Sequence, residues 1–260
     1  MTCAVAVIVG PLGLAVGSFL NVVVWRVPRG ESVVSPPSAC PSCSTPIRPR
    51  DNLPVAGWLL LKGRCRDCAA PISPRYPLVE ALTAGLFVVL ALRFGPDPVL
   101  PAYLYLAAVG LALALIDLDT RRLPDVLTLP SYAVLAALLG VGALLGSDSG
   151  DLVRALLGGA ALYAFYFALC FAYPAGMGFG DVKLAGVLGM ATAWLGWGAW
   201  AVGLFGGFLF GGVWGVGLIA LGRGGRKTKV PYGPFMLLGV LVAVLSGEQL
   251  AGAYLGLVVG

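Results

Sequence analysis

The sequence predicts an all-α, polytopic membrane protein with about eight transmembrane helices. Of its 260 residues, 59% are hydrophobic and only 11% are charged. The mean hydropathy is +0.93. Ordinary soluble domains do not have this balance. Apolar stretches close to the length that spans a bilayer core as a helix also recur from one end of the chain to the other.

Turn-forming or charged segments separate the predicted helices. The expected ranges are about 3–24, 78–94, 99–118, 126–145, 153–173, 183–200, 202–221 and 235–258. The first range has no basic segment before it and no clear small-residue cleavage site, so a retained helix is expected rather than a signal peptide. Only Gly196–Gly203 offers a turn signal between the sixth and seventh helices.

The positive charges predict the topology. All but Arg93 and Arg154 of the 17 lysines and arginines fall on one side of this eight-helix arrangement. That side is expected to be cytoplasmic, because loops rich in Lys and Arg stay inside. One long polar segment, Arg26–Pro77, lies there. The expected division is a first transmembrane helix at 1–25, a cytoplasmic loop domain at 26–77 and a transmembrane core at 78–260.

The loop domain carries four of the six cysteines, as two Cys-x-x-Cys pairs. They are Cys40, Cys43, Cys65 and Cys68. Two such pairs can supply four thiolates to a tetrahedral zinc ion and fill its coordination sphere, so a structural site is expected. Disulfides and a redox Cys-x-x-Cys are the alternatives, although the cytoplasm disfavours disulfides. The sequence has no histidine, which excludes Ser-His-Asp catalysis and His-ligated metals.

Asp117 and Asp181 lie at the edges of long apolar runs, at the same expected end of their helices. A carboxylate near hydrocarbon costs roughly 2.5–3.5 kcal/mol, so an ionisable residue there is a functional candidate. Two close carboxyls tend to share one proton. One can then act as a general base toward water while the other polarises a peptide carbonyl. The structural alternative is that these aspartates, like Asp119 and Asp125, are interfacial helix caps.

Neighbouring residues suit a carboxylate site. Gly178 and Gly180 allow close backbone approach and a positive φ before the next helix begins. Asp125 follows Pro124 and is placed to cap the fourth helix. Lys183 could reach a phosphate, a carboxylate or the headgroup layer. These four residues are therefore expected to support the site.

Several motifs in one order resemble the type IV prepilin peptidase family. Asp117 to Asp125 reads Asp-x6-Pro-Asp, and Gly178 to Lys183 reads Gly-x-Gly-Asp-x-Lys. Further similar segments are Gly17–Pro28, Asp51–Cys65, Ser73–Glu80 and Pro231–Phe235. The sequence departs from the family at Gly57, where Ser is usual, and at Tyr232, where Phe is commoner.

The resemblance implies a bifunctional aspartyl peptidase of the bacterial inner membrane, with Asp117 and Asp181 as its catalytic pair at the cytoplasmic face. It would cleave type IV prepilins or pseudopilins, which have an N-terminal apolar helix, after a glycine. It would then methylate the new N-terminus with S-adenosylmethionine. The four-cysteine loop goes with the methyltransferase activity, although no motif assigns the methyl-donor site. Glu80 is either an ion-pair partner of Arg75 or part of that second site.

Two functions of other classes use the same features. A proton-coupled transporter could use the two aspartates as a relay, but it should need carboxylates near the bilayer midplane. A non-enzymatic scaffold of a secretion or pilus system could use the zinc loop alone. The expected partners are precursor proteins and membrane lipid, with no nucleic acid.

Overall fold

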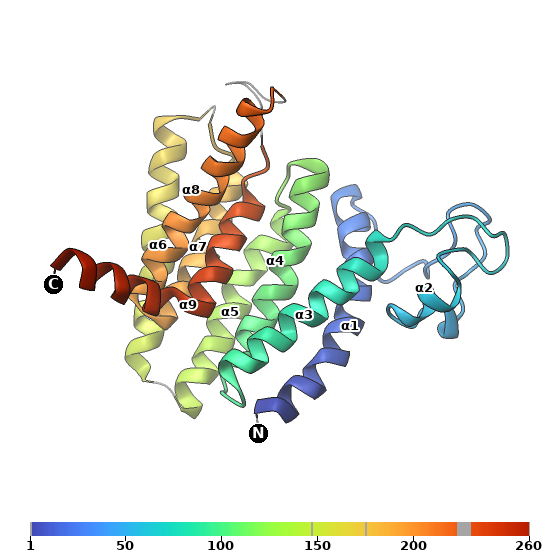
Figure 1. The fold of residues 1–260 in the computed structure, drawn as a ribbon, viewed down its shortest axis with the longest axis horizontal. Helices are drawn as coiled ribbons and strands as arrows, with labels where there is room; N and C mark the ends of the chain where they lie inside the picture. The colour runs from blue at the N-terminus through green and yellow to red at the C-terminus, as the bar shows by residue number, and fades with distance from the viewer. Residues whose placement is uncertain (1, 147, 175, 223–229, 260) are drawn as a thin grey trace. The chain divides into compact units, whose positions relative to one another are not determined.

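The described part of the chain is predominantly α-helical, as the sequence predicts (Figure 1). The computed structural model describes residues 2–146, 148–174, 176–222 and 230–259. Its helices are α1 (Thr2–Arg26), α2 (Ala56–Leu60), α3 (Arg75–Phe94), α4 (Leu100–Thr120), α5 (Asp125–Leu145), α6 (Ser149–Ala172), α7 (Phe179–Leu195), α8 (Trp197–Ala220) and α9 (Gly233–Val259), with 3-10 turns η1 (Val27–Arg29) and η2 (Pro49–Asp51). The chain divides into two compact units, Met1–Pro96 and Asp97–Gly260.

Seven helices in the described part of the chain are long and apolar enough to cross a membrane. They are α1, α3, α4, α5, α6, α8 and α9. The protein is therefore a multi-pass membrane protein. The eighth long helix, α7, has only 17 residues. It is buried from Leu184 to Trp194 and packs against α5, α6, α8 and α9, so it forms the centre of the second unit.

The boundary between α7 and α8 differs from the prediction of helices at 183–200 and 202–221. The helices run Phe179–Leu195 and Trp197–Ala220 instead, with the turn at Gly196. Gly196 has a φ of +140°, which side chains other than hydrogen rarely allow. The earlier start places Asp181 inside the first turn of α7 rather than just before the helix.

Two charged side chains from other helices hold this turn. The Arg154 guanidinium donates to the carbonyls of Ala193 (2.6 Å) and Trp194 (2.5 Å) at the C-terminal end of α7. Glu248 Oε1 accepts the N–H of Ala199 in the first turn of α8, at 2.8 Å. The cation and the anion each match the sign of the helix end that they contact. These contacts are tertiary, so local sequence patterns do not reveal them.

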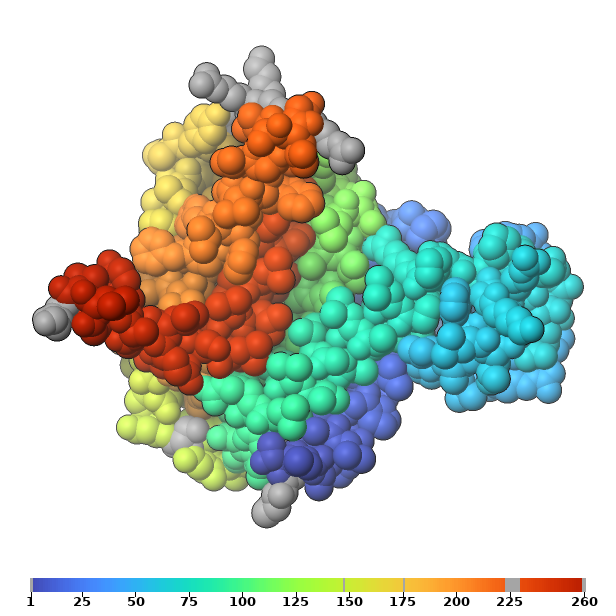
Figure 2. Space-filling model, in the orientation of Figure 1, coloured from blue at the N-terminus to red at the C-terminus, as the bar shows by residue number. Residues whose placement is uncertain are grey.

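In the first unit, α1 packs along α3 through small residues. A Cβ at Gly13 would lie 2.7 Å from Ala84 Cα, and one at Gly17 would lie 2.6 Å from Glu80 Cα. Such close backbone approach is common where helices pack in lipid. The segment between the two helices forms a lobe of this unit (Figure 2). Helix α3 lies with α1 in the first unit.

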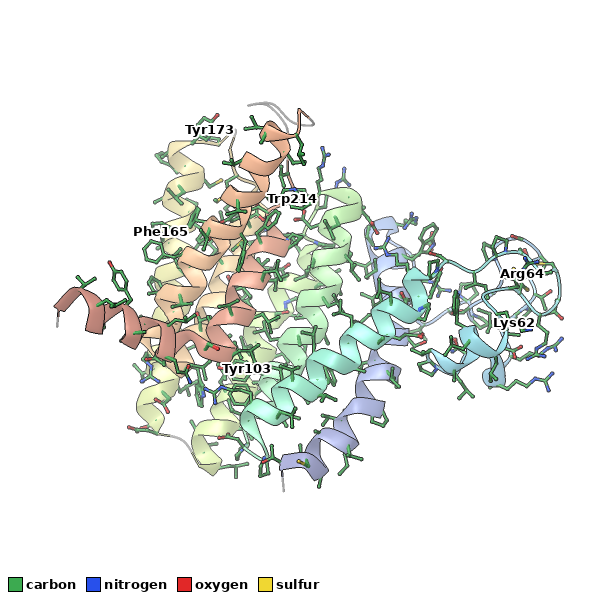
Figure 3. All side chains as sticks on the ribbon, in the orientation of Figure 1. Lys62, Arg64, Tyr103, Phe165, Tyr173 and Trp214 are labelled. Carbon is green, nitrogen blue, oxygen red and sulfur yellow. The ribbon has the colours of Figure 1, made fainter. Side chains whose placement is uncertain are left out.

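The outer surface of the second unit is strongly apolar. Phe165 on α6 and Trp214 on α8 are 40% and 55% exposed (Figure 3). Large apolar side chains exposed along helices suit a lipid environment, which has no aqueous penalty for them. Four of the basic residues used to predict the topology lie outside the described residues: Arg223, Arg226, Lys227 and Lys229.

Candidate functional site

Asp117 lies in the last turn of α4, and its side chain is buried. Its Oδ2 accepts a hydrogen bond of 3.0 Å from the N–H of Gly233. Gly233 is the first residue of α9, so the carboxyl group of Asp117 lies at the N-terminus of another helix. Free N–H groups and the helix dipole at that end favour negative charge.

Asp181 lies in the first turn of α7 and is also buried. Its Oδ2 accepts the N–H of Gly178 at 3.2 Å, while its own N–H donates to the Gly178 carbonyl at 3.0 Å. This reciprocal pair is the arrangement of a capping box, which fixes the side chain at the helix start. Both aspartates therefore accept hydrogen bonds at helix N-termini, one from a distant segment and one locally.

One side chain links the two aspartate segments. Leu123, in the connection between α4 and α5, lies 3.0 Å from the position a Cβ would take at Gly180 and 3.5 Å from that at Gly233. The first glycine precedes Asp181, and the second holds Asp117. The two aspartate segments therefore meet at Leu123. The structure thus gathers both aspartates at one end of the second unit.

The two glycines at the start of α7, Gly178 and Gly180, allow close approach of neighbouring groups. The expectation of a positive φ there is wrong, because Gly178 has φ −77° and Gly180 lies in α7 with no positive φ. A Cβ at Gly180 would instead crowd Leu123 Cβ at 3.0 Å. The absence of a side chain therefore lets the α4–α5 connection lie against the start of α7.

Lys183 and Asp125 join the same two segments by an ion pair. Lys183 Nζ donates to both oxygens of Asp125, at 2.7 and 2.8 Å. The residue at the N-cap of α5 is Pro124, so Asp125 does not cap the helix as expected but pairs with Lys183. The Tyr132 hydroxyl donates to the Lys183 carbonyl at 2.6 Å. These contacts tie the start of α5 to the start of α7.

No sequence pattern assigns a role to Gly233 or Leu123. Gly233 lies in the segment Pro231–Phe235, which the family resemblance singled out without a function. The available signal was a glycine directly before Pro234 at a helix start, because Gly233 then keeps a free N–H at the opening of α9. Leu123 gave no signal, since a leucine beside a proline has no chemistry of its own.

The two carboxyl groups have the surroundings of an acid–base pair. Burial opposes charge on either group, whereas the helix N-termini favour it. With one proton between them, one group can accept a proton from water while the other donates a hydrogen bond to a carbonyl. Such a pair titrates as a unit.

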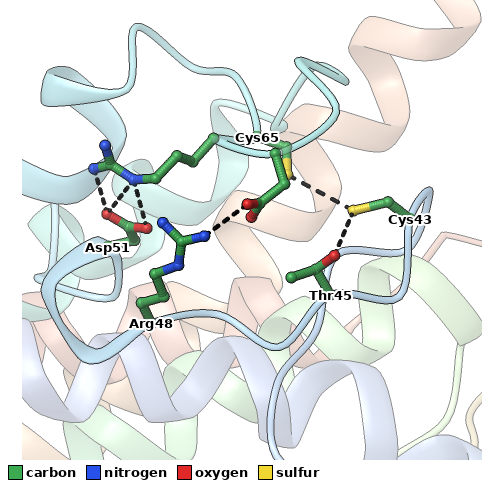
Figure 4. A network of polar contacts seen from close by, with 7 residues as sticks. Cys43, Thr45, Arg48, Asp51 and Cys65 are labelled. Carbon is green, nitrogen blue, oxygen red and sulfur yellow. Dashed lines mark hydrogen bonds and ion pairs between the residues drawn. The ribbon is translucent and has the colours of Figure 1, made fainter.

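The four cysteines of the loop come together as the sequence predicts. Their Sγ atoms all lie within 4.8 Å of one another, and all four thiols are free. Cys40 Sγ lies 3.8 Å from Cys68 Sγ. Cys43 Sγ lies 4.0 Å from Cys65 Sγ (Figure 4). A tetrahedral ion with metal–sulfur bonds of about 2.3 Å requires sulfurs about 3.8 Å apart. The cluster can therefore hold one metal ion.

The two cysteine pairs form two copies of one local structure. In each, the N–H of the first cysteine donates to the carbonyl five residues later, at 3.0 Å for Cys40 and 2.8 Å for Cys65. The residue after each second cysteine, Ser44 and Ala69, has a positive φ of 59° and 57°. Each turn thus points two sulfurs inward, and the pair of turns completes a four-sulfur site.

The pKa values of Cys43, Cys65 and Cys68 are shifted in different directions. The Thr45 hydroxyl and N–H lower the pKa of Cys43 to about 6. Backbone N–H groups, that of Cys68 first, lower the pKa of Cys65. The N–H of Ala70 favours the Cys68 thiolate, but burial and the neighbouring cysteines outweigh it and raise its pKa to about 12. Four crowded sulfurs thus do not all ionise unaided, and a bound cation would supply the missing positive charge.

Ion pairs join the two halves of the loop. Arg66 holds Asp51 through contacts of 2.6–3.0 Å, and Arg48 pairs with Asp67 at 2.8 Å (Figure 4). Arg66 and Asp67 both lie between the cysteines of the second turn. No hydrophobic residue between Val24 and Val79 is buried in the described structure. The loop therefore depends on polar links and on whatever its cysteines bind.

Two family models match the chain in succession. Residues 12–94 match the bacterial peptidase A24 N-terminal domain, and residues 104–216 match the type IV leader peptidase family. The first match covers most of the first unit, and the second covers α4 to most of α8, including both buried aspartates. No solved structure matches the chain.

Several curated proteins are similar over nearly the full chain. A prepilin leader peptidase/N-methyltransferase of Aeromonas hydrophila is 39% identical over 93% of this chain and 91% of its own length. One of Pseudomonas aeruginosa is 36% identical over 94% and 91%. One of Neisseria gonorrhoeae is 40% identical over 75% of each.

Proposed function

The chain belongs to the type IV leader peptidase family, and on that basis we propose that it cleaves the leader from type IV prepilins or pseudopilins and methylates the new N-terminus. Two buried carboxyl groups gathered at one end of the second unit are the observation that carries the peptidase part. The N-methyltransferase activity in the names of these relatives supports the second activity.

In the proposed cleavage, Asp117 and Asp181 share one proton. The ionised member takes a proton from a water molecule, which attacks the peptide carbonyl after a glycine. The protonated member donates a hydrogen bond to the carbonyl oxygen and stabilises the charge that develops there. The N–H groups of Gly233 and Gly178 hold the two carboxyls in position.

The location of the pair suits a substrate with an apolar helix. Asp117 is in the last turn of α4, and Asp181 is in the first turn of α7. Both are thus near a membrane surface rather than the midplane, which disfavours a transmembrane proton relay. A precursor helix lying in the bilayer would present its leader junction at this depth. We place this end at the cytoplasmic face of the inner membrane because the positive residues gather there.

We further propose that Cys40, Cys43, Cys65 and Cys68 bind one structural zinc ion. The sulfur spacing fits a four-sulfur site, and the loop has no buried hydrophobic residue among those described. Four protein ligands leave no open position, so the ion would fold the loop and take no part in a reaction. The loop supports the methyltransferase, whose name implies S-adenosylmethionine as methyl donor.

Replacing Asp181 with Asn tests the peptidase. Asn keeps the shape but cannot take a proton, so precursor cleavage in proteoliposomes should fall by at least about 100-fold, the usual contribution of acid–base catalysis. Asp148→Asn is the matched control. Asp148 caps the N-terminus of α6, whereas Asp181 follows the C-terminal end of that helix in the chain. Full cleavage by D181N would refute the assignment. If D181N loses cleavage while D148N keeps it, the protein cannot be a non-enzymatic scaffold.

Metal analysis of the purified protein tests the zinc site. One zinc ion per chain is expected, and Cys65→Ser should lose it while Cys170→Ser should not, since Cys170 lies outside the cluster. Methylation should fall in C65S, whereas cleavage should continue. A metal content near zero under reducing conditions would reject the proposal.

A further inference from the structure

Glu80 is a buried carboxylate that the proposed cleavage does not use. It lies in the second turn of α3 and is 7% exposed. It belongs to the first unit, whereas Asp117 and Asp181 belong to the second. Nearly complete burial of a carboxylate is costly unless its oxygens are bonded, so each of its oxygens needs an account.

One oxygen of Glu80 has a protein partner. Oε2 accepts the N–H of Val55 at 2.7 Å. Val55 precedes α2 and has a φ of 60°, an uncommon conformation for a branched residue. Glu80 therefore joins α3 to the first turn of α2 inside the loop. This contact gives Oε2 a structural role and leaves Oε1 without one.

The other oxygen of Glu80 is open. Among the described residues, the Val55 N–H is the one hydrogen-bond donor found for the Glu80 side chain, it contacts Oε2, and no ion pair of Glu80 is found. No fully enclosed side-chain oxygen in this part of the chain lacks a partner, so Oε1 reaches the solvent-accessible surface. The closeness of α1 limits access from one side, because a Cβ at Gly17 would lie 2.6 Å from Glu80 Cα.

A buried carboxylate with one free, accessible oxygen is suited to bind a cation that can donate a hydrogen bond. Such a cation is formed by the reaction proposed above. Peptide cleavage leaves an α-amino group, whose pKa is about 7.7–8.0, so most of it is protonated at pH 7. The protonated amine has no lone pair with which to attack a methyl carbon. N-methylation therefore needs a base that removes this proton.

We propose that Glu80 is the general base of the N-methylation, a role that rests on the proposed function. Oε1 accepts a hydrogen bond from the α-ammonium group and takes one proton. The nitrogen lone pair then forms a bond to the methyl carbon as the carbon–sulfur bond of the donor breaks. The products are an N-methylammonium group, a neutral thioether and protonated Glu80, which later loses its proton to solvent.

Glu80→Gln separates this role from the structural one. The Gln carbonyl oxygen can still accept the Val55 N–H, but the amide cannot take a proton. A Glu80 that only supports α2 predicts near-normal methylation in E80Q. A base predicts a loss of about 100-fold or more at pH 7. Glu31→Gln is the control, since Glu31 is an exposed carboxylate of the same unit.

The assay uses full-length protein in proteoliposomes with a pilin precursor and S-adenosylmethionine carrying a tritiated methyl group. We expect E80Q to cleave the precursor within about twofold of the wild-type rate and to keep its zinc. Its methylation should recover steeply from pH 7 to pH 9, where the amine loses its proton to water. The wild-type rate should change little over that range. Unchanged methylation by E80Q at pH 7 refutes the proposal.

The methyl donor also carries an ammonium group, which Glu80 could bind instead of the new N-terminus. A binding measurement tests this alternative. S-adenosylhomocysteine should bind E80Q and wild type equally well. Binding weakened tenfold or more would show that Glu80 holds the donor, and the proposal would be wrong. If E80Q loses zinc or unfolds, Glu80→Asp decides. A base predicts partial methylation with the wild-type pH profile, whereas a purely structural role predicts damage as great as in E80Q.

Methylation by the wild-type protein shows whether the role of Glu80 or the proposed function itself has failed. Cleavage without any wild-type methylation would reject the second activity itself. Methylation by both wild type and E80Q would reject only the role of Glu80.

Discussion

Gly233→Ala should slow precursor cleavage without preventing folding. The Gly233 N–H is the hydrogen-bond donor to Asp117 Oδ2 at 3.0 Å, and alanine retains it. The added Cβ, however, would lie 3.0 Å from that same oxygen and 3.5 Å from Leu123 Cδ2. The substitution therefore pushes on one carboxyl group of the proposed pair while leaving its chemistry intact.

The expected magnitude follows from the displacement. An ordinary contact starts near 3.4 Å, so the Asp117 oxygen must move by about 0.4 Å. A misplacement of about 1 Å can cost about 100-fold in rate. Scaled to the smaller shift, the loss is about sixfold, and it should appear in kcat because substrate contacts elsewhere are unchanged. Asp117→Asn should cost far more, since it removes the acid itself.

Single-turnover cleavage of a precursor in proteoliposomes measures this loss. Gly215→Ala in α8 is the matched control, because a Cβ there meets nothing within 4 Å. Its rate should equal that of wild type. A G233A enzyme that cleaves at the wild-type rate would refute the claim that the close contact with Gly233 fixes the position of the Asp117 carboxyl group. A loss confined to KM would show that Gly233 contacts the substrate instead.

Two further predictions concern stability. Gly158→Ala should destabilise the second unit by about 1–3 kcal/mol, because the new Cβ would lie 2.1 Å from Ala193 Cβ between α6 and α7. Unfolding in detergent measures this, with Gly140→Ala as the open-space control; equal stability would contradict close packing there. Asp51→Asn should destabilise the loop less as pH falls. Arg66 holds the pKa of Asp51 below its usual value, so its stabilisation is full above about pH 4 and is lost as pH drops through the lower, folded-state pKa. The difference in loop melting temperature between wild type and D51N should therefore shrink from pH 6 to pH 3; a constant difference would contradict the ion pair.

The sequence predicted the helices well where turn signals and charges bounded them. Helices α4 and α5 begin and end within two residues of the predicted ranges, because Pro124 and the charges around it separate them. The α7–α8 boundary was missed because both helices are rich in glycine and apolar throughout. Arg154 and Glu248 mark the true turn, but they come from distant helices.

In the candidate site, too, features set by local sequence could be predicted and features set by tertiary contacts could not. The four cysteines could be grouped from sequence because two short repeats suffice to form the cluster. Asp117 and Asp181 could be proposed because carboxylates are costly in apolar segments. The N–H that holds Asp117 could not, since Gly233 lies 116 residues away in sequence. The open oxygen of Glu80 likewise depends on Val55, from α2, meeting α3.

The two proposed activities depend on different physical means of holding a site. The carboxyl pair needs fixed positions, and it is held by helix starts packed around the most buried helix, α7. The loop has no such packing, since none of its described hydrophobic residues is buried. Its shape comes from polar links, among them the four sulfurs, the Arg66–Asp51 and Arg48–Asp67 pairs and the contact of Val55 with Glu80. Because Glu80 is the one link in that set from a membrane-spanning helix, a reaction that uses its free oxygen would be coupled directly to the folding of the loop.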